Sequence, residues 1–434
     1  MNLKKILLSS VAAVALTSVA AFADSTSSGT AIVGAAVLDT AVAADQTGDY
    51  LVFPVYYANT AGWSTNLKVV NTNSTNAVVA KVVIREFMSS AEKLDFPIYL
   101  TPGDVWEGTL VNVGGTVYIQ STDDSMMAAD GTPASATNPV NQALYAADTL
   151  QDNTKGYVEV FGIAEINATS VTPAWVVNTP LAKTALVAKY KAELNGNSTV
   201  AAWRGVNNDS IYGQEVISAA NANGNLAMTL MATAFENVTG PTANTNTIIG
   251  QDTTIINSSN KYVTTTNVIA DIENALQKSS VYATYYDASA TAAAETSLLL
   301  TQPMKKYRYA LSHPTLASVI GYTAAATIVG PTSYSFVYGP LARNQLENSL
   351  ISSNDYSGGV ATTYSCNYEV CQISVNSFVG AYTKGYVDFS LKQPTRSSMP
   401  VIPAVMTAKA VGTTNVTNII TPAFRSSVLP NLLP

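Results

Sequence analysis

The chain has 434 residues, enough for one large or two ordinary globular domains, and a formal net charge of −7. Charged residues make up 12% of it, about half the usual soluble share, whereas 47% is hydrophobic. This acidity argues against a nucleic-acid partner, because such binding requires basic groups that neutralise phosphates. A surface of hydroxyl and amide groups suits a protein that packs against copies of itself or is glycosylated. Compositional drift explains the same numbers equally well.

The N-terminus has the three parts of a secretory signal peptide. Lys4 and Lys5 precede an apolar run of small residues, which ends in an Ala-Phe-Ala site. We therefore predict that residues 1–23 are removed by cleavage between Ala23 and Asp24. The run is short for a membrane span, and no later stretch of sequence is a transmembrane helix. Cleavage would change the net charge from −7 to −9, because both lysines leave and no acid leaves with them.

N-terminal sequencing of the secreted protein is expected to begin at Asp24. The reason is the small-residue site that signal peptidases recognise immediately before it. A mature product that still carries Met1 would contradict export.

Five runs of strand-forming residues, separated by turn sequences, lie between residues 50 and 113. They are 51–57, 65–70, 77–87, 94–100 and 105–113. Pro54 cannot donate a ladder hydrogen bond, which predicts an edge strand or a bulge. Thr101-Pro102-Gly103-Asp104 carries Pro and Gly at the central positions of a type II turn. We expect consecutive runs to pair as an antiparallel meander that buries one face.

Three segments of this block share a recurrent pattern. VFPVYYANTAGWSTNLKVVNTN, VVAKVVIREFMSS and LDFPIYLTPGDVWEG are similar to a "PYY…GW.T…VNT" opening, a "VKVRFRE" strand and an "LDF…LSPGDVW" hairpin. In these features the chain resembles a family of bacterial exported proteins often called cell-surface proteins. The resemblance is good over about a third of the chain, and looser at GYVEVFGI, IYGQEVIS, TSLLLTQPMKKYRY and GYVDFSL. It implies a location at the bacterial cell surface and brings no enzymatic activity with it.

Beyond residue 113, strands alternate with long polar loops and two short helices. Residues 121–153 form a loop, and 179–194 form a helix with Thr179 as its cap and Pro180 at its first position. A second helix is predicted from Val268 to about Lys278. Further strands are predicted at 156–163, 211–218, 226–235, 281–286, 297–301, 333–338, 372–378 and 385–391. The fold class is mainly β, with antiparallel β-sandwich architecture.

The predicted domains follow from these elements. Residues 24–48 are an N-terminal arm or weak first strand, 49–240 a β-sandwich domain, and 241–434 a second β-rich domain. The boundary falls in the Thr- and Asn-rich segment 238–265, and one continuous domain is the alternative.

The residue types for catalysis are sparse. His313 is the single histidine, and the sequence has no G-x-S-x-G elbow, P-loop or dinucleotide fingerprint. Paired carboxylates could hydrolyse a glycan without histidine, but no spacing singles out a pair. The acids on or beside predicted strands are therefore interpreted as solvated residues of strand faces or turns: Asp95, Asp104, Glu107, Glu159 and Asp388. No catalytic residue and no cofactor is predicted.

Two small sites remain as candidates. Asp123, Asp124 and Asp130 lie in the long loop and are candidate Ca²⁺ ligands, although the D-x-D-x-D alternation is absent. Cys366 and Cys371 are separated by four residues, and in an oxidising compartment we expect them to form a local disulfide.

The sequence favours a non-enzymatic, secreted structural protein of the bacterial cell surface, such as a self-assembling coat or surface-layer-like subunit. The expected partners are copies of the chain and, as a candidate, cell-envelope glycan. An outer-membrane β-barrel is the first alternative, although its strands would be more even in length. A carbohydrate-active hydrolase or glycan-binding protein is the second.

Overall fold

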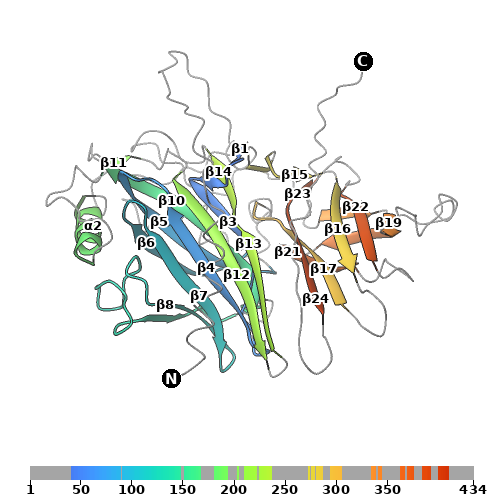
Figure 1. The fold of residues 1–434 in the computed structure, drawn as a ribbon, viewed down its shortest axis with the longest axis horizontal. Coiled ribbons are helices and arrows are strands. Elements are labelled where there is room, and N and C mark those ends of the chain that lie inside the picture. The colour runs from blue at the N-terminus through green and yellow to red at the C-terminus, as the bar shows by residue number, and fades with distance from the viewer. Residues whose placement is uncertain are drawn as a thin grey trace, which may run out of the picture. The chain divides into compact units, whose positions relative to one another are not determined.

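The computed structural model describes the chain between Ala41 and Lys409, with gaps, as a mainly β protein (Figure 1). The described residues are 41–88, 90–147, 151–167, 180–193, 203–204, 210–221, 224–236, 272–273, 275–278, 280–286, 294–304, 334–338, 341–344, 362–366, 369–375, 384–391 and 399–409. Every strand pair within them is antiparallel, which confirms the predicted architecture. The predicted signal peptide and residues 24–40 of the arm lie outside these ranges.

Two sheets make up the part before residue 237. The first, called the β10 sheet, has the order β1 (Ala41–Val42), β14 (Thr233–Glu236), β3 (Tyr50–Tyr57), β10 (Lys155–Asn167), β5 (Asn76–Glu86) and β6 (Glu92–Leu100), with β11 (Trp203–Arg204) also paired to β10. The second, called the β12 sheet, has the order β13 (Gly224–Met231), β12 (Ile211–Asn221), β4 (Trp63–Asn71), β7 (Val105–Val113), β8 (Thr116–Ser121) and β9 (Val140–Ala143), with β2 (Thr47–Gly48) paired to β12.

The two sheets enclose one hydrophobic core. Alternate residues of β5, from Val78 to Ile84, face alternate residues of β4 and β7, including Leu67, Val69 and Leu110. Trp106 is fully buried among them, and its ring lies 5.8 Å from that of Phe96. The β-branched, period-two sequence of β5 supplies this face because such side chains pack well on a pleated surface. The β10 sheet and the β12 sheet therefore pack face to face as a β-sandwich.

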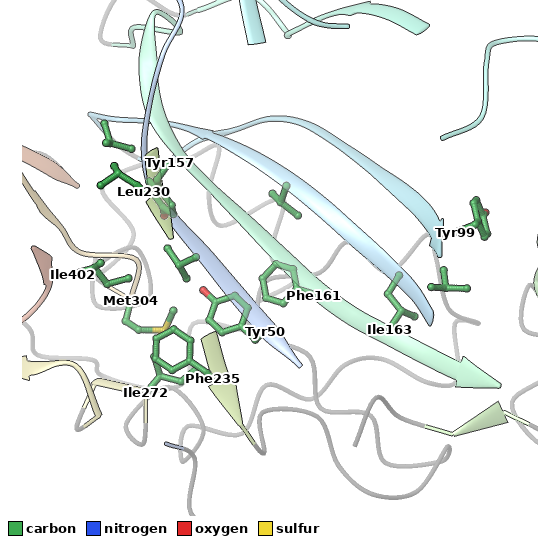
Figure 2. Packing of buried hydrophobic residues seen from close by; sticks show 14 of the residues in the cluster. Tyr50, Tyr99, Tyr157, Phe161, Ile163, Leu230, Phe235, Ile272, Met304 and Ile402 are labelled. Atoms are coloured by element: carbon green, nitrogen blue, oxygen red, sulfur yellow. The ribbon is translucent and has the colours of Figure 1, made fainter. Parts of the chain in front are cut away.

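The β10 sheet is buried on its other face as well. The helix α2 (Pro180–Glu193) packs there through Ala182, Leu186, Val187 and Tyr190. Apolar residues from beyond residue 271 join the same cluster; Figure 2 shows Ile272, Met304 and Ile402 near the rings on this face. The rings of Tyr50 and Phe161 stack with centroids 4.8 Å apart, and Phe235 lies 5.2 Å from Tyr50. All eleven residues of β5 are therefore buried.

The predicted meander is wrong, although the five strands lie where they were expected. β3, β5 and β6 belong to one sheet, whereas β4 and β7 belong to the other. The burial of the strands explains the division. β4 alternates between buried and partly exposed residues, so it suits a sheet with one solvated face, whereas β5 is buried throughout. Of these five strands, β5 and β6 are the one pair that is consecutive in sequence and also hydrogen-bonded, and both belong to the β10 sheet.

Pro54 lies in an interior strand, so the predicted edge position is wrong and the alternative bulge is confirmed. β14 pairs with β3 only from Tyr50 to Val52, and the register with β10 shifts between Gly156 and Val158, opposite Pro54. Gly156 is needed at this bulge because a Cβ atom there would lie 1.9 Å from the carbonyl oxygen of Arg85.

The type II turn before β7 is confirmed. Gly103 has φ of 71°, and the Asp104 amide donates to the Thr101 carbonyl at 3.1 Å. The first helix is also confirmed as α2. Ile272, Glu273 and Ala275 are helical, but the predicted end at Lys278 is wrong, because Gln277–Lys278 forms β15 and pairs with β23 (Met399–Pro400).

The strands after residue 279 form smaller sheets. One has the order β16 (Ser280–Tyr286), β22 (Lys384–Ser390) and β19 (Leu341–Asn344); another has β21 (Val370–Ser374), β17 (Ala294–Thr301) and β24 (Ile402–Lys409). A core that includes Val281, Phe389 and Leu298 packs both sheets together. β18 (Tyr334–Tyr338) pairs with β20 (Thr362–Cys366). The predicted domain boundary at residue 240 lies outside the described residues.

The arm is tied into the sandwich from Ala41 onward, since β1 pairs with β14 and β2 pairs with β12. No helix in the described part of the chain has the length and apolar character to cross a membrane.

Candidate functional site

Buried charges are the chemical feature that distinguishes the described residues. On β5, Lys81 and Arg85 share the period-two face of Val79 and Val83, which is the face covered by α2 and the later strands. Both side chains are buried. A charge in such a place must be paired, because the effective cost of taking one ion out of water is on the order of several kcal/mol. Two clusters of charged residues meet this requirement, one around Arg85 and one around Lys183 of α2.

The first cluster surrounds Arg85. Its Nε pairs with Glu159 Oε2 on β10, and its Nη2 lies 3.8 Å from Glu92 Oε2 on β6. Its Nη1 donates to the Ser90 carbonyl at 3.1 Å. The two strands that flank β5 in the sheet thus each supply one carboxylate, because the register places residues of β6 and β10 beside Arg85.

Two tyrosines close this cluster. Tyr50 donates to Glu159 Oε1 at 2.7 Å, and the hydroxyls of Tyr157 and Ser90 lie 2.7 Å apart. Burial raises the pKa of the Tyr157 hydroxyl well above its usual range, and the negative charge of Glu159 raises it further. The Tyr157 hydroxyl therefore stays protonated.

The Arg85 cluster is arranged for structure rather than for acid–base chemistry. Both oxygens of Glu159 are engaged, one by Arg85 and one by Tyr50. A glycosidase needs one carboxyl group to protonate the leaving oxygen and a second to act from the opposite face of the sugar. Glu159 is fully buried and held by these two contacts, so it is not placed for either role.

The second cluster surrounds Lys183 on α2. This fully buried ammonium group contacts Asp104 Oδ2 and Ser125 Oγ, lies 3.2 Å from Asp124 Oδ1, and donates to the Tyr99 carbonyl at 3.2 Å. The partners of Lys183 come from β6, from the turn before β7 and from the loop after β8. The Lys183 cluster thus ties the helix to two loops at the edge of the sandwich.

Asp104 is held on both carboxylate oxygens. Oδ1 accepts from the Val105 amide at 2.9 Å, whereas Oδ2 accepts from the Thr101 amide at 3.0 Å and the Thr101 hydroxyl at 3.1 Å. The type II turn that the sequence predicts is what brings these donors to one carboxylate.

Glu215 is a separate buried acid on β12. By the period of two it shares the inward face of Gly213, where a Cβ atom would meet Leu51 and Phe53 of β3. Burial raises the pKa of Glu215 well above its usual range, while a backbone hydrogen bond to Val55 lowers it in part. The folded state therefore holds a proton that the unfolded chain releases. Stability from this group is complete below the ordinary carboxyl pKa and falls as the pH rises above it.

The structure separates the three candidate Ca²⁺ ligands. Asp123 accepts from the Ser125 amide at 2.9 Å, and Asp124 pairs with Lys183. Asp130 accepts from the Thr132 hydroxyl, the Thr132 amide and the Asn138 side chain, and these hydrogen bonds, that of the hydroxyl first, lower its pKa. The described residues contain no group of three or more His, Cys, Asp or Glu side chains arranged to hold a metal ion.

The interpretation of strand acids as solvated is wrong for Asp104 and Glu159, which are buried and paired with cations. Asp95 is partly buried and pairs with Lys81. Glu107 is exposed, as expected, and lies 2.6 Å from Lys68. Asp388 lies in β22, and His313 lies outside the described residues.

Sequence reasoning missed the basic residues Lys81, Arg85 and Lys183. A signal was present in β5, where two cations occur in a strand whose two faces both carry valine or isoleucine. Such a strand is buried on two sides, and its cations then require acidic neighbours.

Cys371 is buried, and the described residues include no free cysteine thiol. The side chain of Cys366 is outside what the structure describes, so the Cys366–Cys371 disulfide stays a prediction.

The chain matches no protein-family model, no curated protein and no solved structure. Its function must therefore be inferred from its own residues.

Replacing either member of the central ion pair, as Arg85→Leu or Glu159→Leu, should lower the free energy of unfolding by about 3–5 kcal/mol, because the other charge is left buried. The double variant should lose less than the sum of the two. Urea denaturation measures these changes. The pair Lys68 and Glu107, which is open to solvent, is the matched control, since the Lys68 side chain is partly exposed and that of Glu107 is exposed. Each leucine variant there should change stability by at most about 1 kcal/mol. Additive losses at Arg85 and Glu159 would contradict the coupling.

Thiol counting on the denatured, unreduced protein should find no free thiol, because Cys366 and Cys371 are predicted to be bonded. Chain-entropy reasoning gives the short loop a stabilisation of about 2 kcal/mol. Two free thiols, or bridges between chains on a non-reducing gel, would contradict a local disulfide.

Proposed function

We propose that this protein is a non-enzymatic, secreted structural subunit of the bacterial cell surface that associates with copies of itself. The observation that carries the proposal is the outer edge of β13. This strand has eight residues and no charged side chain, and within the described residues its one strand partner is β12. A long, uncharged strand edge is a template for pairing with another chain.

The opposite edge of the sandwich, at β6, is covered by other segments of the chain. On β6, the Tyr99 amide donates to the Ser125 carbonyl at 2.8 Å, and the Lys93 carbonyl accepts from the Tyr145 amide at 2.9 Å. The loop after β8 and the segment after β9 thus cover that edge. β13 instead presents the exposed residues Ala227 and Thr229, neither of which opposes the approach of a second strand.

Three further features support the proposal. The carboxylates of the Arg85 and Lys183 clusters are engaged by cations, which leaves them without a hydrolytic arrangement. The chain has few charges to keep copies apart. The predicted signal peptide and the resemblance to exported cell-surface proteins agree with an extracellular location.

Two lysines on the β13 edge, Ala227→Lys with Thr229→Lys, should abolish assembly of the mature protein at concentrations where the wild type forms oligomers. Both positions are exposed, so the fold should be retained. The added positive charge brings the acidic chain nearer to neutrality, which by itself would favour association. A loss of assembly would therefore show that the copies associate through the β13 edge. Light scattering across protein concentration and salt measures it.

Val113→Lys with Thr116→Lys is the matched control. These exposed residues pair at the end of the β7–β8 hairpin, so the variant adds the same charge away from β13. It should assemble as the wild type does. A wild type that remains monomeric under every condition would overturn the structural role and favour a glycan-binding or enzymatic one.

A further inference from the structure

We propose that Lys183 and Asp104 become joined by an amide bond between their side chains, so that the Lys183 cluster is a self-modification site. The proposal rests on burial, contact and the groups around the pair. Lys183 is 0% exposed and Asp104 4% exposed, and the amine nitrogen contacts Asp104 Oδ2 directly. It does not depend on the proposed assembly.

The two reactants are held by rigid elements. Lys183 is in the first turn of α2, and Asp104 closes the type II turn with two backbone amides and one hydroxyl fixed on its carboxylate. Reactants fixed in contact can have effective concentrations of about 10⁵ M or more. The product is also favoured by the site, because an amide replaces two charges that are shielded from water.

The two carboxylate oxygens of Asp104 would have different roles in the reaction: Oδ1 would become the amide oxygen, and Oδ2 would leave as water. The Val105 amide, 2.9 Å from Oδ1, is placed to stabilise the negative charge that develops on this oxygen during attack. Oδ2 accepts from the Thr101 amide and hydroxyl and lies 3.4 Å from Ser125 Oγ. These donors favour the departure of Oδ2.

Asp124 supplies the proton relay. Its Oδ1 is 3.2 Å from the Lys183 nitrogen, and its side chain is 28% exposed. A carboxylate in this position can accept a proton from the attacking nitrogen and return it to the leaving oxygen. Its partial exposure gives the released water a route to solvent.

The reaction balances without an oxidant or a co-reactant. The Lys183 ammonium transfers one proton to Asp104 Oδ2, and the free amine attacks the Asp104 carboxyl carbon to form the C–N bond. Asp124 takes a second proton from nitrogen and passes it to Oδ2. The C–Oδ2 bond then breaks, water leaves, and Oδ1 becomes the amide carbonyl.

Lys81 provides an internal comparison. It is equally buried, and its ion pair is with Asp95, whose side chain is 24% exposed. The described ion pairs bring one carboxylate to Lys81 but two to Lys183. The Lys81 pair therefore lacks the relay that Asp124 gives to Lys183, and we expect it to remain ionic.

The test is mass spectrometry of the full, reduced and denatured protein, with peptide mapping after proteolysis. The wild type should weigh one water less than its sequence requires, and a branched peptide should join Lys183 to Asp104. Lys183→Arg keeps the positive charge but lacks the amine nucleophile, so the deficit should vanish. Asp124→Ala should slow or abolish the deficit while Lys183 and Asp104 are both present.

Lys81→Arg is the matched control and should retain the full deficit. A wild type with the mass of an unmodified chain and no branched peptide would overturn the proposal and leave a buried ion pair. A deficit that persists in Lys183→Arg would place the loss of water elsewhere, such as in an aspartate succinimide, and would also overturn it. If a variant fails to fold, the branched peptide of the wild type decides alone.

Discussion

The covered outer face of the β10 sheet determines what else this structure can contain. β5 and β10 are buried on both faces, so every polar group on them must find its partner inside the protein. Arg85 and Glu159 meet this requirement across neighbouring strands, and Tyr50 and Ser90 complete it. The ion pair fixes the register of β5 against β10, because a shift of one residue would separate Arg85 from Glu159.

The same constraint explains how helix α2 is attached. An apolar face would hold the helix against Tyr99, but hydrophobic contact alone is non-directional. Lys183 adds direction, since its contacts to Asp104, Asp124 and Ser125 permit one placement of the helix end.

The sequence predicted the strands well but not their neighbours. Period-two patterns located β3, β4, β5, β6 and β7 to within two residues at each end, and turn chemistry located Gly103. A pattern reports which side chains share a face, whereas the choice of sheet depends on residues far along the chain, such as the β10 residues that separate β3 from β5. The first helix was predicted from Pro180, but its buried face was not. A lysine such as Lys183 is expected at the solvent-exposed surface, and its burial becomes clear only when the structure places Asp104 and Asp124 beside it.

The position of β10 has a consequence for the time course of folding. β10 lies between β3 and β5, and β12 lies between β13 and β4, so each sheet needs an interior strand that is far along the chain from the first strand it joins. Pairings between distant segments form slowly, because the loop entropy is lost before the contacts are gained. A chain that has emerged only as far as β9 lacks β10, which joins β3 to β5 in one sheet, and lacks β12 and β13, which extend the other sheet beyond β4. Such a chain cannot complete either sheet before its later strands emerge, and this late completion would suit the proposed export, in which a chain crosses the membrane before it folds.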